Sequence, residues 1–129
     1  MTVVLDSWAI MCLLEGAEPA ASRVQVQIDS GETIMSWINL GEVFYVLRRV
    51  AGETAALDTI RDVESAVKVL TPDRATVLDA ARIKSDYRMS YADSFAAATA
   101  ARLGFPLWTG DPELLVTGAP WNPVDPSTG

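Results

Sequence analysis

The sequence predicts one α/β domain in which helices cover both faces of a small, mostly parallel β-sheet. Short apolar stretches of strand length alternate along the chain with longer stretches of helical pattern, as in chains that form parallel sheets. The chain has 129 residues, enough for one domain with one core, and it contains no internal repeat and no linker. Residues 1–129 are therefore expected to form a single domain, with a flexible tail at about 125–129.

The strands are predicted from short apolar and β-branched runs. The first run, TVVL, is long enough for one buried strand and ends at Asp6. The last residues are rich in proline, which suits at most one further edge strand. The four main predicted strands are 2–5, 33–36, 67–70 and 106–109.

The helices are predicted from apolar periodicity and from signals that begin or end a helix. Glycine follows several of the segments, and Arg48 and Arg49 lie in the last turn of the third. Thr71 and Pro72 are expected to cap and begin the fifth helix. The predicted helices are 7–16, 20–31, 37–52, 53–66, 71–89 and about 90–103.

Half of the residues are apolar and the mean hydropathy is +0.19, which is high for a monomer. We therefore expect apolar surface to be buried in a homodimer or under another protein. No run approaches the roughly 18 apolar residues of a membrane span, and the first residues lack the basic start of a signal peptide. With Cys12 as its single cysteine the chain has no disulfide framework, so a cytoplasmic protein without membrane association is expected.

The chain contains no histidine and has a net charge of −7. The lack of histidine excludes serine–histidine triads, cysteine–histidine pairs and histidine-based ribonuclease chemistry. The negative charge argues against general affinity for nucleic acid, which needs basic residues against phosphates. A bound metal ion could nevertheless supply positive charge locally.

Three acids follow predicted strands or begin predicted helices. Asp6 ends the first strand, Asp93 lies in the first turn of the helix that starts near Ser90, and Asp111 follows the strand 106–109. Each has a purely structural interpretation, because Asp6 could cap a helix, Asp93 could interact with a helix dipole, and Asp111, just before a proline, could also cap a helix. Where parallel strands end at one edge of a sheet, these acids would also meet.

Glu42 has no such simple interpretation. It lies in the third predicted helix within the stretch LGEVFYVL, which is apolar nearly all round and therefore predicts a buried helix. A buried carboxylate without a partner costs several kcal/mol, so Glu42 needs a cation or a hydrogen-bond network. An ion pair with Arg49, about two turns along the helix, is the structural alternative.

A metal site would account for all four acids together. Magnesium and manganese take oxygen ligands, and a cation would offset the repulsion within a carboxylate cluster. Such ions lower the pKa of a bound water and clamp a scissile phosphate, which would allow a chain without histidine to be a hydrolase.

The order of these features resembles the PIN-domain family, in particular the VapC-type toxins of bacterial toxin–antitoxin pairs. The resemblance rests on a first strand ending in LDS, on N-x-x-E in a helix, on YAD before an alanine-rich helix and on T-x-D after a strand. It extends from residue 3 to about 124. Each motif is short, and the match depends on their order and on the elements that carry them.

The resemblance implies a three-layer α/β/α sandwich and a magnesium- or manganese-dependent endoribonuclease. It also implies inhibition by a cognate antitoxin and a dimeric state. The implied catalytic and metal-binding residues are Asp6, Glu42, Asp93 and Asp111. The implied supporting residues are Ser7, Asn39 and Thr109.

Several basic and aromatic side chains are candidates for RNA contacts. Trp8 and Tyr91 lie beside the acids in the sequence and are candidates for base stacking, although most aromatic residues here suit a core. The candidates for phosphate contacts are Arg48, Arg49, Arg82, Lys84, Arg88 and Arg102, which equally suit solvated helix faces.

Other functions remain as alternatives. A phospho-acceptor domain would have adjacent acids after the first strand, and a haloacid-dehalogenase-like phosphatase would have D-x-D there. In this chain the first strand is followed by DSW, at residues 6–8, which fits neither pattern. A catalytically inert PIN-fold protein-binding module fits the same sequence. Metal-dependent cleavage of RNA would distinguish the endoribonuclease from that module.

Overall fold

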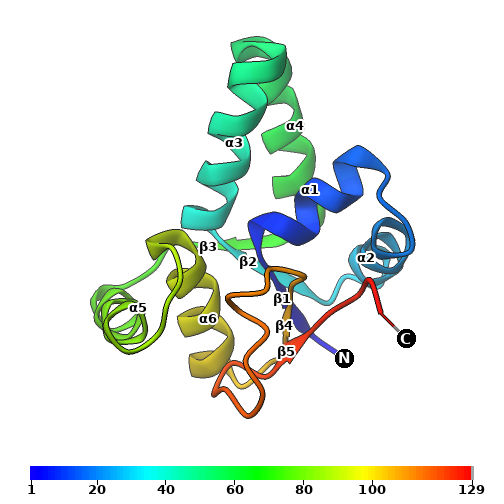
Figure 1. The fold of residues 1–129 in the computed structure, drawn as a ribbon. Helices are drawn as coiled ribbons and strands as arrows, with labels where there is room; N and C mark the ends of the chain where they lie inside the picture. The colour runs from blue at the N-terminus through cyan, green and yellow to red at the C-terminus, as the bar shows by residue number, and fades with distance from the viewer. Residues whose placement is uncertain (129) are drawn as a thin grey trace.

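The computed structural model describes residues 1–128 and places a five-stranded sheet at the centre of the molecule (Figure 1). The strand order is β3-β2-β1-β4-β5, and every neighbouring pair is parallel. The strands are β1 (Val3–Leu5), β2 (Thr33–Ser36), β3 (Lys68–Leu70), β4 (Leu107–Trp108) and β5 (Pro123–Val124). The helices are α1 (Ser7–Glu15), α2 (Ala20–Asp29), α3 (Trp37–Ala51), α4 (Glu53–Ala66), α5 (Arg74–Asp86) and α6 (Tyr91–Leu103).

Alternating side chains of β1 divide the core into two layers. Val3 and Leu5 pack with buried residues of α1, α2, α3 and α4, whereas Val4 packs with α6 and the C-terminal loop. In Figure 1, α1 and α2 accordingly lie on one side of the sheet, and α5 and α6 lie on the other. This arrangement confirms the predicted three-layer α/β/α sandwich.

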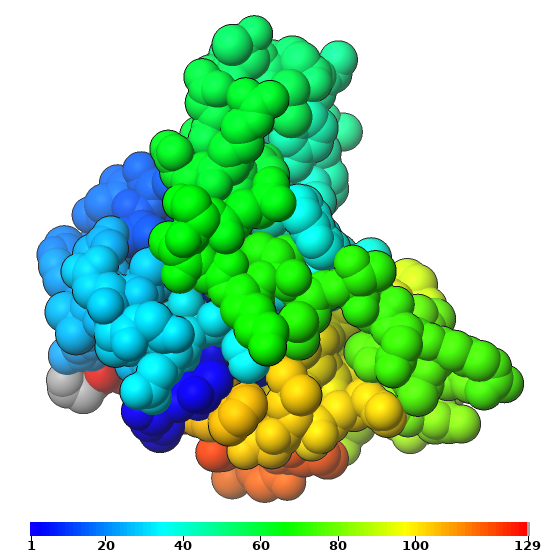
Figure 2. Space-filling model, turned by 180° about the vertical axis from the view of Figure 1, so that it is seen from behind, coloured from blue at the N-terminus to red at the C-terminus, as the bar shows by residue number. Residues whose placement is uncertain are grey.

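The hairpin of α3 and α4 stands out from the rest of the molecule in both views (Figures 1 and 2). The first turns of α3 are held by buried Asn39, Leu40 and Val43, but the residues near its end, such as Val50, are exposed. The expectation that this helix is buried all round is therefore wrong. Its apolar sequence reflects contacts with α4 and with neighbours near its start, which periodicity alone does not separate from complete burial.

The predicted elements exist, and their ends differ by small amounts. The edge strand expected near the C-terminus is β5, which pairs with β4. The start of α5 was placed too early, because Asp73 rather than Thr71 is its N-cap and accepts a 2.8 Å hydrogen bond from the Thr76 amide. Pro72 lies before the helix, in the segment that leads from β3.

The chain beyond β5 contacts α2. The guanidinium of Arg23 donates hydrogen bonds to the carbonyl oxygens of Pro126 and Thr128, at 2.9 and 2.6 Å. Residue 129 lies outside the described residues, so the flexible tail stays a prediction. Within residues 1–128, none of the helices has the length and apolar character that crossing a bilayer requires.

Candidate active site

Asp6 and Asp111 follow neighbouring parallel strands, so both lie at the carboxyl edge of the sheet. Asp6 follows β1 directly and is the N-cap of α1, where its Oδ1 accepts a 2.9 Å hydrogen bond from the Ala9 amide. Asp111 lies on the loop after β4, and its Oδ1 accepts a 2.9 Å bond from the Glu113 amide. Asp111 therefore stabilises the turn that follows it, and it does not cap a helix as the proline after it suggested.

Asp93 reaches the same edge from the other layer. It lies in the first turn of α6, and its backbone amide donates a 3.1 Å hydrogen bond to Oγ of Ser90, the N-cap residue. The side chain is only 8% exposed. Asp6 and Asp93 therefore do lie at helix starts, as their structural interpretations predicted. These positions still leave carboxylate oxygens that could bind a metal ion.

The carboxyl of Asp6 lies in an environment that disfavours its charge. Burial, with only 1% exposure, is the main reason that the pKa of Asp6 is raised from 3.8 to about 7. The nearby Thr109 side chain and the Ala9 amide lower this pKa, while the charges of Asp111 and Glu42 raise it. Oδ2 of Asp6 is buried and has no hydrogen-bond partner among residues 1–128.

Asp93 and Asp111 form a strongly interacting pair. Burial raises the pKa of Asp93 to about 7, and a proton shared with the carboxyl of Asp111 contributes in the same direction. The charges of Asp111 and Asp6 raise this pKa further, whereas the Ser90 hydroxyl lowers it. Asp6, Asp93 and Asp111 are thus within electrostatic reach of one another, without a basic residue between them that would offset the repulsion.

Glu42 contributes to the cluster from α3, but not as a buried group. It is half-buried, and the Tyr45 hydroxyl donates a 3.4 Å hydrogen bond to its Oε2. No ion pair joins Glu42 to Arg49 in the part of the chain that the structure describes, so the structural alternative for this residue is wrong. Its carboxylate instead lines the same cleft as Asp93 and Asp111.

The three predicted supporting residues join the elements that carry the acids. The Ser7 hydroxyl donates a 3.0 Å hydrogen bond to the Asn39 carbonyl, which links α1 to α3. The Asn39 side-chain amide donates a 3.0 Å bond to the carbonyl of Ala92, the residue before Asp93. Oγ1 of Thr109 accepts a 3.0 Å bond from the Asp111 amide. Removing any of these side chains would loosen the placement of an acid rather than remove one.

The cleft at this edge has a volume of about 490 Å³ and lies between α1, α3, the start of α6 and the loop after β4. Its acidic lining residues are Glu15, Glu42, Asp93, Asp111 and Glu113. Sequence reasoning missed two of them. Glu113 could have been found as the second acid of the loop after β4. Glu15 could have been found from helical spacing, because residues 8, 11, 12 and 15 all line the cleft.

Trp8 forms one wall of this cleft and packs on the loop that carries Asp111. The ring lies so close to Gly110 that a Cβ at that position would be 2.1 Å from Cζ2 of Trp8. Only glycine therefore fits at position 110 beside the Trp8 ring, and this contact helps to place the backbone that carries Asp111. The expectation of a base-stacking role for Trp8 stays untested.

The donor set of the cleft suits a hard divalent cation. All candidate ligands are carboxylate oxygens, which magnesium and manganese prefer. Asp6 is buried behind the residues that line the cleft, and its Oδ2 lacks the partner that a cation would provide. In residues 1–128, no group of three or more acidic, cysteine or histidine side chains is placed so that it could hold a metal ion as it stands. Binding would therefore move carboxylates inward, at least that of half-buried Glu42.

Comparisons with known proteins agree with this architecture. The sequence matches the PIN domain family over residues 3–119. No curated protein matches the chain. The structure is similar to that of DNA-bound VapBC from Salmonella typhimurium, with a TM-score of 0.78, 17% identity and coverage of 98% of each chain.

Two further solved structures have the same fold. VapBC-1 from nontypeable Haemophilus influenzae has a TM-score of 0.76 at 20% identity and covers 99% of this chain and 100% of its own. VapC20 from Mycobacterium tuberculosis, a toxin that cleaves the sarcin-ricin loop, has a TM-score of 0.68 at 17% identity and covers 85% of this chain and 92% of its own. From its sequence match and its three-layer fold, the chain belongs to the PIN-domain family.

Proposed function

We propose that this protein is a metal-dependent endoribonuclease that acts as the toxin of a toxin–antitoxin pair. The single observation that carries the proposal is the group of four interacting carboxylates at the carboxyl edge of the sheet, with Asp6 and Asp93 held at raised pKa and no basic side chain among them. Structural ion pairs do not produce this arrangement, because they place a cation beside each acid. The similar toxin from Mycobacterium tuberculosis, which cleaves the sarcin-ricin loop, supports the substrate class.

Asp6, Glu42, Asp93 and Asp111 would hold magnesium or manganese. When bound, such an ion supplies positive charge at the scissile phosphate and lowers the pKa of a water molecule. The Ala9 amide orients Asp6 by donating a hydrogen bond to its carboxylate. Asp111 is oriented by the bond from its own amide to the Thr109 hydroxyl and by the bond that its carboxylate accepts from the Glu113 amide. Because the pKa of Asp6 and of Asp93 is about 7, both carboxyls are partly protonated near pH 7. Metal binding would therefore release protons from them.

The proposed partners are an RNA substrate, a cognate antitoxin and a second copy of the chain. The similar VapBC structures from Salmonella typhimurium and Haemophilus influenzae support the antitoxin. An apolar groove of about 250 Å³ between α1, α2 and α4 is suited to an apolar segment of another protein. Its apolar lining includes Leu13, Leu14, Ile28 and Val63. Light scattering of the isolated chain should give a mass above that of the 13.9 kDa monomer.

The deciding experiment is RNA cleavage by the purified protein in magnesium, in manganese and in EDTA. We expect cleavage in either metal, none in EDTA, and recovery when metal is added back in excess. Folded protein that does not cleave RNA in either metal would contradict the nuclease proposal and favour an inert protein-binding module. Equal cleavage in EDTA would contradict the metal site.

A further inference from the structure

An acidic cleft needs positive charge nearby if it is to bind RNA. No lysine or arginine is among the residues that line it, whereas five acids are. A metal ion would offset part of this charge at the scissile phosphate, but the neighbouring phosphates of the strand would still face carboxylates. Any basic residue that attracts them must therefore lie outside the lining of the cleft.

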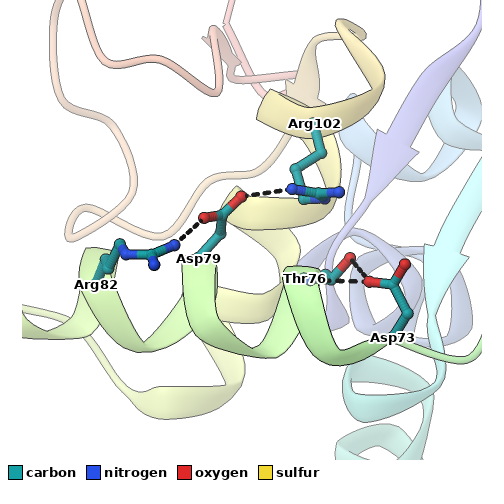
Figure 3. A network of polar contacts seen from close by, with 5 residues as sticks. All are labelled: Asp73, Thr76, Asp79, Arg82 and Arg102. Atoms are coloured by element: carbon teal, nitrogen blue, oxygen red, sulfur yellow. Dashed lines mark hydrogen bonds and ion pairs between the residues drawn. The ribbon is translucent and has the colours of Figure 1, made fainter.

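Most candidate arginines already have acidic partners. Figure 3 shows Arg82, on α5, and Arg102, on α6, on either side of Asp79. Their ion pairs with Asp79 measure 2.7 and 2.8 Å. Arg48 pairs with Glu53 at 2.6 Å, where α3 is followed by α4. These arginines are partly neutralised by their partners, so they are poorly placed to attract a phosphate.

Arg48 and Arg49 are both exposed, and they differ in their partners. Arg48 pairs with Glu53, whereas within residues 1–128 Arg49 forms no ion pair. Its guanidinium lies over the Tyr45 ring, 5.2 Å from the ring centroid, and the Tyr45 hydroxyl donates its hydrogen bond to Glu42. A continuous column therefore runs along one face of α3 from the cleft to Arg49.

Helical spacing explains why this column leads out of the cleft. Glu42 and Val46 line the cleft, and Tyr45 and Arg49 are their neighbours at three-residue spacing on the same face. Tyr45 is 47% exposed, so the column is open to solvent along its length. Stacking on a tyrosine ring holds an arginine in place while leaving its donors free for a phosphate.

We propose that Arg49, positioned by Tyr45, binds a backbone phosphate of the RNA strand next to the one held in the cleft. The inference rests on the proposed function, because it deepens the substrate contacts of the same site. It assigns the strand a direction across the molecule, from the carboxylates along α3 toward the tip of the α3–α4 hairpin. The contact is to the backbone, so it adds affinity without sequence preference.

The test compares Arg49→Ala with Arg48→Ala, two substitutions of adjacent, exposed arginines on the same helix. Binding is measured by fluorescence anisotropy of a short, unstructured, labelled single-stranded RNA in EDTA over a series of salt concentrations. Cleavage of the same RNA is measured in manganese. We expect Arg49→Ala to weaken binding about 10-fold at low salt, as for a lost charged hydrogen bond, and to raise KM with little change in kcat.

The salt dependence gives a second measure of the same contact. The slope of log K against log salt should become shallower by about 0.7 in Arg49→Ala and remain unchanged in Arg48→Ala. Arg49→Lys should keep the salt slope, because it keeps the charge. Equal binding and slope in wild type and Arg49→Ala would overturn the proposal even if the protein cleaves RNA.

The two proposals can fail separately. Wild-type protein that binds RNA with the predicted Arg49 dependence but cleaves none in metal would overturn the nuclease activity and leave the contact standing. Wild-type protein that neither binds nor cleaves RNA would overturn both. An equal loss of binding in Arg48→Ala and Arg49→Ala would overturn the specific role of the column.

Discussion

Aspartates serve opposite purposes in two regions of this molecule. On α5, Asp79 lies between Arg82 and Arg102, and these hydrogen bonds hold the pKa of its carboxyl below the ordinary value (Figure 3). At the carboxyl edge of the sheet, Asp6 and Asp93 are buried among other acids, and their pKa is raised to about 7. The first arrangement is complete within the chain. In the second, the groups that shift the two pKa values include no basic side chain, and for this reason we propose it as the place where a metal ion would bind.

Loss of activity should show the largest difference between the two regions. Asp6→Asn and Glu42→Gln keep the shape of each side chain but remove a charged ligand. We expect each to reduce metal-dependent RNA cleavage by more than the roughly 10- to 100-fold that loss of an outer-shell partner costs. Asp79→Asn should cleave at the wild-type rate. Initial rates in manganese measure the contrast, and an equal loss in Asp79→Asn would contradict it.

The pH dependence of stability should have opposite signs in the two regions. Asp6 and Asp93 have a raised pKa in the folded state, so as pH rises from about the ordinary value of 3.8 to about 7 the unfolded chain ionises first and stability falls. The pKa of Asp79 is lowered, so its contribution is present above the ordinary value and is lost as pH falls through the folded value.

Thermal melts in EDTA across this pH range measure the first effect. The chain has no histidine that would titrate in the same interval. Asp93→Asn should flatten the fall in melting temperature, whereas Asp79→Asn should leave it unchanged. A wild-type melting temperature that is constant or rises between pH 4 and 7 would be inconsistent with the raised pKa values.

The packing of Trp8 on Gly110 allows a smaller, steric test of how the acidic edge is built. A Cβ at residue 110 would lie 2.1 Å from the ring, so we expect Gly110→Ala to lower the free energy of unfolding by about 1–3 kcal/mol through overpacking. In a Trp8→Ala background the same substitution should cost less. Chemical denaturation of the four proteins gives the coupling energy, and additive effects would mean that the ring does not constrain this loop.

The smallest effect is expected for the ion pairs of Asp79, with Arg82 on α5 and with Arg102 on α6. These ion pairs are partly exposed, with side-chain exposures of 32–68%. Asp79→Asn should therefore destabilise the fold only slightly, because exposed ion pairs contribute little, and high salt should reduce the difference. A large fall in the free energy of unfolding, measured by chemical denaturation, would show that this network is more than a surface feature.

The sequence was sufficient for the fold because the local signals and the tertiary structure agree. The β-branched run before Asp6 is a strand, and the residues after it form a helix capped by that aspartate. The start of α5 differs from the prediction because threonine and aspartate are both good caps, and the structure uses Asp73 rather than Thr71. Local sequence does not contain that information.

The site was harder to predict than the fold. The acids at strand ends were identifiable, because parallel strands bring their ends together. The partial exposure of Glu42 could not be predicted, because it depends on the α3–α4 hairpin standing out from the rest of the molecule (Figure 1). Glu15 and Glu113 also line the cleft, and for these two the sequence did contain a signal, in the helical spacing of α1 and in the second acid of the loop after β4.

The most direct test of the account is a thermal melt of wild type and Asp93→Asn in EDTA and in manganese. If Asp93 belongs to a repulsive cluster that waits for a cation, Asp93→Asn should melt at the same or a higher temperature than wild type in EDTA. Wild type should gain melting temperature with manganese by linkage, and the variant should lose most of that gain. A variant that melts lower than wild type in EDTA, yet keeps the full manganese-induced rise, would reduce Asp93 to a helix-start residue and contradict the metal site.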